Sequence, residues 1–343
     1  VNVRPSVNVR GEDIVMATAV ASSNVALVAG ATRGCGRSIA VALGSRNFTV
    51  FCTGRSSSTQ PRQARSEAEF QQGDINDISP FCLNYRPETI EETARLVTEA
   101  GGNGVPVVVD HTDEGQVASL VERIQTETGR LDVIVNSVWG GDELTEWGKS
   151  FWELDLGKAH RMLDQCLKSH VTTNRLAVPL LMKSPGGLIV EMTDGAALHY
   201  RGNFMYDLVK VALSRMAFGM AEELRPHNVS SVSVTPGFLR SEAMLDAFGV
   251  TEENWKPAVE KDPNFLFSET PAFVARGVAA LACDAEAMKH SGKALSSWEL
   301  AKLYEVTDVD GSSPNWGAHA KDAEFGAEQV ASHNRFVGGF SDA

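Results

Sequence analysis

Short apolar runs alternate with longer amphipathic stretches along most of the chain from residue 24 onward. An apolar run that ends at glycine or a polar residue is typical of a buried parallel strand, whereas apolar positions spaced three and four apart indicate helices. Strands that alternate with helices are joined by right-handed crossovers, so we predict an α/β fold with a doubly wound parallel sheet and helices on both faces. The pattern predicts strands within residues 25–30, 48–54, 104–110, 131–138, 186–193 and 229–237, and helices within residues 37–45, 88–102, 114–129, 161–182 and 203–227.

The regular pattern has one long interruption and two irregular ends. Residues 56–87 are polar and rich in turn-forming residues, which indicates an insertion after the second predicted strand. Residues 1–22 are expected to form a flexible leader, and residues 312–343 a polar tail that either lies over a neighbouring subunit or stays disordered. The remaining residues, 23–311, are expected to form a single domain, because α/β folds of about 250 residues are commonly single domains.

Composition and charge argue against several classes of protein. The formal net charge of −13 opposes a general attraction to nucleic acid or to an anionic membrane. The five cysteines show no Cys-x-x-Cys spacing, so we expect neither a disulfide framework nor a metal site. No apolar run is long enough to span a membrane, and the first residues lack the layout of a signal peptide, so we expect a cytoplasmic protein.

A glycine-rich turn follows the first predicted strand and opens into a helix. It reads Gly30-Ala-Thr-Arg-Gly34-Cys-Gly36, and glycines let the chain turn tightly and let a pyrophosphate approach the backbone. The free N–H groups at the start of the helix favour an anion. The order of strand, turn and helix predicts a dinucleotide-binding site; the alternative is a tight turn without a ligand.

The end of the second predicted strand bears on which dinucleotide binds. A NAD-specific fold usually places Asp or Glu there to hold the 2′-hydroxyl of the ribose, but this sequence reads Thr53-Gly54-Arg55-Ser56. Arg55 and Arg33 can instead bind a 2′-phosphate, whose geometry suits a guanidinium group. We therefore predict NADP(H) as the cofactor. The alternative is that both arginines are solvated and that the neighbouring insertion rearranges this region.

Tyr206 and Lys210 lie four residues apart in a predicted helix, which places both side chains on one face. With the glycine turn, Asn136 at a strand end and this pair in order, the chain resembles the short-chain dehydrogenase/reductase family over about residues 24–300. It resembles a subgroup with a carboxyl-terminal extension, matched here by residues 291–311. The resemblance implies a Rossmann-type fold, a nicotinamide cofactor, hydride transfer to a carbonyl or from an alcohol, and a homodimer or homotetramer.

The resemblance also implies roles for individual residues. Tyr206 matches the catalytic tyrosine, Lys210 the lysine that holds the nicotinamide ribose and lowers the pKa of the phenol, and Thr193 the position of the catalytic serine. A threonine hydroxyl keeps the donor and the acceptor that are needed to orient a carbonyl. The expected cofactor contacts are Gly30, Thr32, Arg33, Gly34, Cys35, Gly36, Arg55, Ser56, Asp110, His111, Asn136, Ser137, Tyr206, Lys210, Pro236, Gly237 and Ser241.

Two positions depart from the family pattern. The family's Asn-Asn-Ala-Gly segment reads Asn136-Ser-Val-Trp139 here, and the family's catalytic asparagine falls near Cys166. Because cysteine has no amide side chain to hold a water, the proton relay is expected either to run through His170 or Asn174 or to be weakened. The simpler interpretation of Cys166 itself is a small buried residue.

Three functions are compatible with these predictions. The first is an NADP(H)-dependent oxidoreductase that reduces a ketone or aldehyde of an apolar or aromatic compound, since aromatic residues follow the fourth strand and recur in the expected substrate lid, residues 238–270. The second is an imine reductase or a reductive cyclase with the same cofactor, for which the altered site leaves room. The third is a regulator that binds NADP without turnover, against which the intact Tyr206 and Lys210 argue.

Overall fold

A computed structural model of the chain describes residues 23–59, 81–82, 86–195, 197–322 and 326–339. The predicted leader, residues 1–22, lies outside the described residues. So does most of the predicted insertion, of which residues 60–80 and 83–85 are not described.

Seven parallel strands form one sheet in the order β3-β2-β1-β4-β5-β6-β7. Strand β1 pairs with β2 on one side and with β4 on the other, so the strand order reverses at this point. Five strands lie within the predicted runs, β3 begins one residue before its predicted run, and β7 is an additional short strand that pairs with β6. The strands are β1 (Val25–Ala29), β2 (Thr49–Gly54), β3 (Asn103–Val108), β4 (Val133–Asn136), β5 (Leu188–Met192), β6 (Ser230–Thr235) and β7 (Ala294–Ser296).

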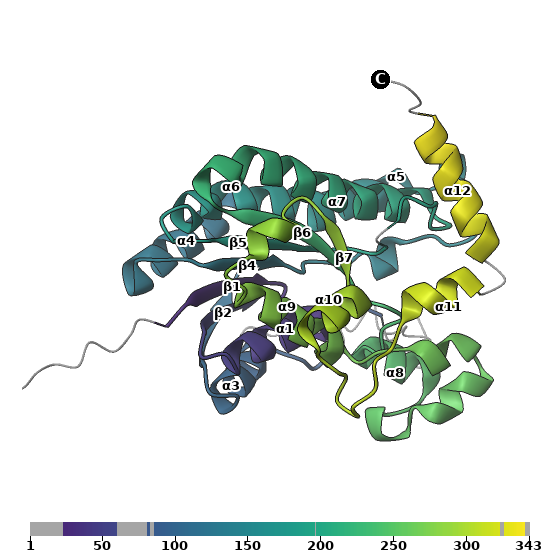
Figure 1. Ribbon diagram of the computed structural model, residues 1–343, viewed down its shortest axis with the longest axis horizontal. Coiled ribbons are helices and arrows are strands. Elements are labelled where there is room, and N and C mark those ends of the chain that lie inside the picture. Colours follow the sequence, from purple (N-terminus) through teal and green to yellow (C-terminus); the bar gives the residue numbers. More distant parts are fainter. Residues whose placement is uncertain (1–22, 60–80, 83–85, 196, 323–325, 340–343) are drawn as a thin grey trace, which may run out of the picture.

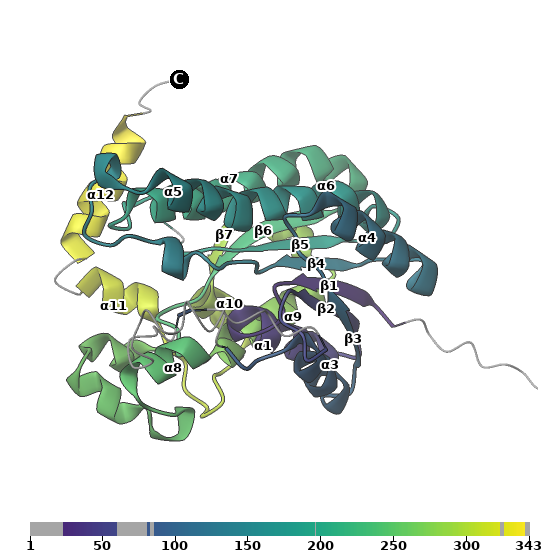
Figure 2. The same ribbon diagram turned by 180° about the vertical axis from the view of Figure 1, so that it is seen from behind.

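Helices cover both faces of the sheet, as Figures 1 and 2 show from opposite sides. Helices α1, α3, α9 and α10 bury apolar side chains against one face, and α4, α6 and α7 against the other. The predicted doubly wound α/β sheet is therefore confirmed. The helices are α1 (Gly34–Gly44), α3 (Ile90–Glu99), α4 (Glu114–Thr128), α5 (Leu156–Leu163), α6 (Ser169–Leu181), α7 (Phe204–Leu224), α8 (Glu242–Phe248), α9 (Pro271–Ala282), α10 (Ser297–Tyr304), α11 (Trp316–Asp322) and α12 (Gly326–Gly338).

The two carboxyl-terminal helices pack against segments at the carboxyl ends of the strands (Figure 1). In α11, Trp316 contacts Phe238, with 5.6 Å between ring centroids, and His319 stacks on Phe267 at 3.7 Å. From α12, Ser332 accepts a hydrogen bond of 2.9 Å from the backbone N–H of Tyr200. The described part of the tail therefore packs on its own chain.

The described helices also bear on membrane association. None of them combines the length and the apolar character that are needed to cross a membrane.

Candidate active site

The segments that follow the carboxyl ends of the strands enclose a cavity of about 550 Å³. In a doubly wound sheet, ligands bind at this edge, where the strand order reverses. The structure thus brings together residues that lie far apart in the sequence. Of the residues that the sequence predicts for the site, the cavity wall contains Gly30, Thr32, Arg33, Gly34, Cys35, Arg55, Ser56, Asp110, His111, Ser137, Thr193, Tyr206, Lys210, Pro236, Gly237 and Ser241.

Two predicted cofactor contacts, Gly36 and Asn136, are absent from the described cavity wall. A Cβ atom at Gly36 would lie 2.1 Å from the carbonyl oxygen of Gly30, so this glycine is required to close the turn. Asn136 is fully buried, and its amide donates hydrogen bonds to Asn174 at 2.9 Å and to Glu191 at 2.8 Å. In this structure Gly36 supports the turn and Asn136 supports the strand ends, and their contact with a cofactor stays a prediction.

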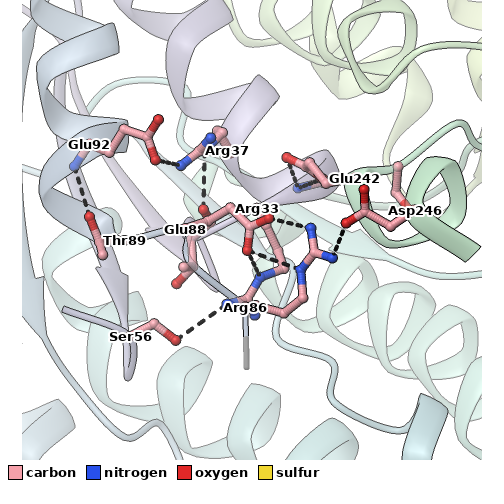
Figure 3. A network of polar contacts seen from close by, with 12 residues as sticks. Arg33, Arg37, Ser56, Arg86, Glu88, Thr89, Glu92, Glu242 and Asp246 are labelled. Atoms are coloured by element: carbon pink, nitrogen blue, oxygen red, sulfur yellow. Dashed lines mark hydrogen bonds and ion pairs between the residues drawn. The ribbon is translucent and has the colours of Figure 1, made fainter. Parts of the chain in front are cut away.

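The glycine turn already holds an oxyanion in this structure. Gly30 has a φ of +82°, and a Cβ there would lie 2.6 Å from the carbonyl oxygen of Ser137, so the turn needs glycine. The N–H of Gly34, at the start of α1, donates to both carboxylate oxygens of Glu242 at 3.2 and 3.0 Å (Figure 3). This carboxylate stands in for a phosphate oxygen, so the turn fits the pyrophosphate of a dinucleotide.

Replacing Glu242 by alanine is expected to strengthen dinucleotide binding. The carboxylate of Glu242 occupies the N–H of Gly34 and would repel a pyrophosphate. Its removal should lower the dissociation constant of NADPH about fivefold. A charge at a helix N-terminus contributes about 1 kcal/mol, which corresponds to about that change in affinity. Titration calorimetry measures the change. The control is Glu260→Ala, which removes an exposed carboxylate from the predicted lid, residues 238–270, to which Glu242 also belongs. Weaker binding in Glu242→Ala would mean that Glu242 helps to hold the dinucleotide.

The predicted arginines line the cavity near the end of β2. Arg33 donates to Glu88 at 3.1 Å and to Ser56 at 3.4 Å, and Arg55 lies 3.7 Å from the carboxylate of Asp110. Burial alone would raise the pKa of Asp110, but hydrogen bonds from the backbone and side chain of residue 112 and the charge of Arg55 lower it overall. The edge of the cavity thus presents cationic groups together with an ionised carboxylate.

His111 fixes the end of β3 to neighbouring elements. Its Nε2 lies 2.7 Å from the hydroxyl of Thr53, and its Nδ1 lies 2.8 Å from the hydroxyl of Thr173. Burial, with the nearby His170, lowers the pKa of His111 to about 3, so the ring is neutral. Although His111 borders the cavity, both its ring nitrogens are engaged by the protein.

Tyr206 and Lys210 come from the first turns of α7. The side chain of Asn203 caps this helix by accepting hydrogen bonds of 3.1 Å from the N–H groups of Met205 and Tyr206. The hydroxyl of Tyr206 donates to Asp194 at 2.7 Å, and the ammonium of Lys210 lies 3.7 Å from the ring centroid of Trp139. The capped helix start therefore places a phenol and an ammonium in one cavity wall.

Thr193 lies beside this pair at the end of β5. Its hydroxyl donates a hydrogen bond of 2.6 Å to the carbonyl oxygen of Lys210. The hydroxyl must therefore turn away from α7 before it can donate to a ligand in the cavity.

The electrostatics of Tyr206 contradict one expectation from the sequence. Burial, followed by the charge of Asp194 and the hydrogen bond to it, raises the pKa of Tyr206 well above its usual value. The pKa of Tyr206 thus shifts opposite to the lowering expected from Lys210, because burial and the carboxylate of Asp194 both raise it. Burial lowers the pKa of Lys210, an effect that Asp194 opposes. Tyr206 is consequently a protonated phenol, suited to act as an acid.

Cys166 lies in a distortion between α5 and α6. Residues Asp164–Lys168 form a π-helical turn, in which one extra residue widens the helix. Cys166 is fully buried beside Met162 and Met205, and burial raises the pKa of its thiol to about 12, so the simpler interpretation of this residue is confirmed. Its neighbour Gln165 lines the cavity instead. Helical periodicity alone could not reveal which of the two residues faces the site.

His170 and Asn174 belong to a buried network behind the cavity. His170 bonds to Glu191 at 2.6 Å and to the carbonyl oxygen of Val138 at 3.0 Å, and Asn174 donates to Glu191 at 2.6 Å. Within the described ranges, neither side chain bonds to Lys210 or lines the cavity. The suggested relay through these residues therefore lacks support, because their polar atoms hold the strand ends together.

Several cavity residues were not identified as site residues from the sequence. Asp194 directly follows Thr193, and Glu242 follows Ser241, so each stands next to a predicted position. The cavity wall also contains Arg86, Asp142 and Gln165. The described residues contain no group of three or more His, Cys, Asp and Glu side chains that could hold a metal ion.

Comparison with known proteins identifies the family. Residues 76–249 match the family model described as short chain dehydrogenase. The chain is 32% identical over 291 residues to dehydrogenase/reductase SDR family member 1 of Mus musculus, covering 84% of this chain and 83% of that protein. Its human counterpart is 31% identical over 294 residues, covering 84% of each. The chain therefore belongs to the short-chain dehydrogenase/reductase family, oxidoreductases that use NAD(H) or NADP(H), as the resemblance predicted.

Solved structures show the same fold. A short chain dehydrogenase from Mycobacterium thermoresistibile superposes with a TM-score of 0.66 at 20% identity, covering 86% of this chain and 91% of that one. A short chain dehydrogenase from Mycobacterium paratuberculosis, solved bound to NAD, gives a TM-score of 0.58 at 21% identity, covering 80% and 95%. At these identities the likeness concerns the fold.

Proposed function

We propose that the protein is an NADP(H)-dependent oxidoreductase that reduces a ketone or aldehyde, or oxidises the corresponding alcohol. The observation that carries the proposal is the protonated hydroxyl of Tyr206, which lies with Lys210 in the wall of the cavity that contains the glycine turn. Family membership supports the oxidoreductase class. The chemistry of the individual residues supports the carbonyl reduction and the NADP(H) preference.

Reduction of a carbonyl needs a hydride on carbon and a proton on oxygen. The bound dinucleotide supplies the hydride. Tyr206 donates the proton, for which the substrate oxygen must replace Asp194 as the acceptor of its hydrogen bond. The ammonium of Lys210 stabilises the negative charge that remains on the phenol oxygen, and Thr193 orients the carbonyl after its hydroxyl turns from the helix.

The preference for NADP(H) over NAD(H) rests on charge. Arg33 and Arg55 line the cavity, and the end of β2 carries no carboxylate for the 2′-hydroxyl of NAD. A guanidinium group suits a phosphate better than a hydroxyl. Because one structural neighbour was solved with NAD, the two cofactors must be compared directly in this protein.

The aromatic side chains around Tyr206 support an apolar or aromatic substrate. The ring of Trp139 meets the ring of Tyr206 edge-on at 5.5 Å between centroids, and the ring of Trp147 lies 5.3 Å from it. Aromatic walls with a few polar groups are usual for sites that bind small organic molecules.

Reduction of an imine is the second candidate, and Asp194 favours it. An imine is reduced most readily when its nitrogen is protonated. The carboxylate of Asp194 contacts the hydroxyl of Tyr206, and Asp142 lines the same cavity, so both can stabilise that positive charge.

A homo-oligomer and a cytoplasmic location remain proposals. Exposed apolar side chains on α6 and α7 support an interface between copies of the chain, because large apolar side chains on one surface mark association sites. These side chains are Val171, Phe204, Leu208 and Phe218. The acidic net charge of −13 gives no reason to expect a nucleic acid partner.

Turnover of NADPH by the purified protein tests the proposed function. We expect oxidation of NADPH in the presence of aryl ketones or aldehydes, with kcat/KM at least about tenfold higher than with NADH, as one charged phosphate contact implies. Turnover with imines alone would identify the second candidate. Tight NADPH binding without turnover on any compound would favour the regulator, and equal use of NADH would refute the cofactor preference.

A further inference from the structure

Arg86 is a cavity residue whose role the glycine turn and the strand end do not explain. It lies near the carboxyl-terminal end of the predicted insertion, residues 56–87, and its side chain lies beside Arg33 and lines the same cavity (Figure 3). Only 8% of this side chain is exposed. A long cation that is held this closely can reach a ligand only from the side that borders the cavity.

Glu88 holds Arg86 and Arg33 side by side. Its carboxylate accepts hydrogen bonds from Nε of Arg33 at 3.1 Å and from Nε of Arg86 at 3.2 Å. Burial alone would raise the pKa of Glu88, but the hydrogen bonds from the two arginines lower it overall, so the carboxylate stays ionised. Glu88 itself is absent from the described cavity wall. One carboxylate behind two guanidinium groups leaves positive charge facing the cavity.

The remaining partner of Arg86 is Asp246 of the lid helix α8 (Figure 3). The side chain of Asp246 is 58% exposed, so solvent and salt screen its charge and it offsets the charge of Arg86 only weakly. This ion pair nevertheless ties the lid to the two arginines. A ligand bound by Arg86 would therefore contact both the nucleotide end of the cavity and the residue that anchors the lid.

We propose that Arg86, together with Arg33, binds the 2′-phosphate of NADP(H) and connects that phosphate to the lid through Asp246. The proposal rests on the NADP(H) preference of the proposed function. Arg86 donates three hydrogen bonds to Glu88 and Asp246, so two of its five N–H groups remain for phosphate oxygens. A dianionic phosphate suits two neighbouring guanidinium groups, because each is a planar donor of paired hydrogen bonds. A residue near the carboxyl-terminal end of the predicted insertion thus becomes a determinant of cofactor choice.

Two nucleotides that differ only in the 2′-phosphate test the proposal without any turnover. Adenosine 2′,5′-bisphosphate and adenosine 5′-monophosphate are titrated calorimetrically into the unmodified protein and into Arg86→Gln. The variant should bind the bisphosphate about tenfold more weakly and the monophosphate within about twofold of the unmodified protein, because only the charged contact to the 2′-phosphate is lost. The control is Arg95→Gln, which removes an exposed guanidinium of α3 paired with Glu99 and should leave both affinities unchanged.

The outcomes separate this proposal from the proposed function. Equal weakening of both nucleotides in Arg86→Gln, or of neither, would overturn the role of Arg86 while the cofactor preference stands. An unmodified protein that binds both nucleotides equally would refute the NADP(H) preference and this proposal with it. Circular dichroism reports the folding of each variant. Arg86→Lys, which keeps the charge but loses the planar donor pair, serves if glutamine disrupts the fold and should lose about threefold for the bisphosphate alone.

Discussion

Tyr206→Phe is expected to lower kcat for carbonyl reduction by about 10²- to 10⁴-fold, the range typical of a lost general acid. The hydroxyl is the proton donor that the structure places in the cavity wall, and its raised pKa keeps it protonated at neutral pH. Phenylalanine keeps the ring that packs against Trp139, so the fold and the affinity for NADPH should change little. Steady-state turnover with NADPH, run beside NADPH titration of the same variant, measures both quantities.

A matched tyrosine provides the control for this prediction. Tyr200 lies in the loop before α7, is 53% exposed and is absent from the described cavity wall, so Tyr200→Phe should keep kcat within about twofold. A Tyr206→Phe variant that keeps its turnover would mean that another group supplies the proton. Asp194, which contacts the hydroxyl, would then be the first candidate.

The order of the main elements could be predicted because it depends on local patterns. Six strands are short apolar runs, of which β3 at the sheet edge stays partly exposed and the other five are buried, and such runs can be recognised without knowing their partners. Strand β7 could not be found in this way. It has three residues, and it exists because Ala294 to Ser296 pair with the end of β6. The π-helical turn at Asp164–Lys168 was not predicted either, because the sequence pattern indicates one continuous helical stretch over residues 161–182.

The predictable part of the site is the part that is set by spacing. The glycine turn and the pair Tyr206 and Lys210 are defined within a few residues, and both line the cavity. Contacts between distant segments could not be anticipated. Gly34 and Glu242 are 208 positions apart, and Arg86 lies near the far end of the predicted insertion from Arg33. Their pairing depends on the fold as a whole.

Burial and a nearby carboxylate explain why the pKa of Tyr206 could not be predicted from its neighbour Lys210. The i, i+4 spacing suggests that the ammonium dominates the phenol, and this holds only when no closer charge competes. Asp194 reaches the hydroxyl at 2.7 Å from the end of β5, while Lys210 faces the ring of Trp139. Burial, together with a carboxylate one residue from a predicted site residue, thus raises the pKa of Tyr206.

Lys210→Met should lower kcat/KM about 10²-fold or more and should remove a pH dependence of cofactor affinity. Methionine fills the same buried space without a charge, so the variant loses only the ammonium group. We propose that this ammonium binds the nicotinamide ribose and stabilises the phenolate. Because burial lowers the pKa of Lys210, the unmodified protein should lose NADPH affinity as pH rises through that lowered pKa, earlier than an ordinary lysine would titrate. NADPH titrations across a pH series measure this loss.

The assignment of that pH dependence to Lys210 follows from the opposite shift of its neighbour. The pKa of Tyr206 is raised well above its usual value, so the phenol stays protonated over the range in which Lys210 loses its proton. Lys210→Met should therefore bind NADPH weakly and almost equally at every pH in this range. Lys183→Met, which removes an exposed ammonium bonded to Gln125, should keep both the affinity and its pH dependence. A Lys210→Met variant with an unchanged alkaline loss of affinity would assign that titration to a different group, and the proposed contact between Lys210 and the ribose would be wrong.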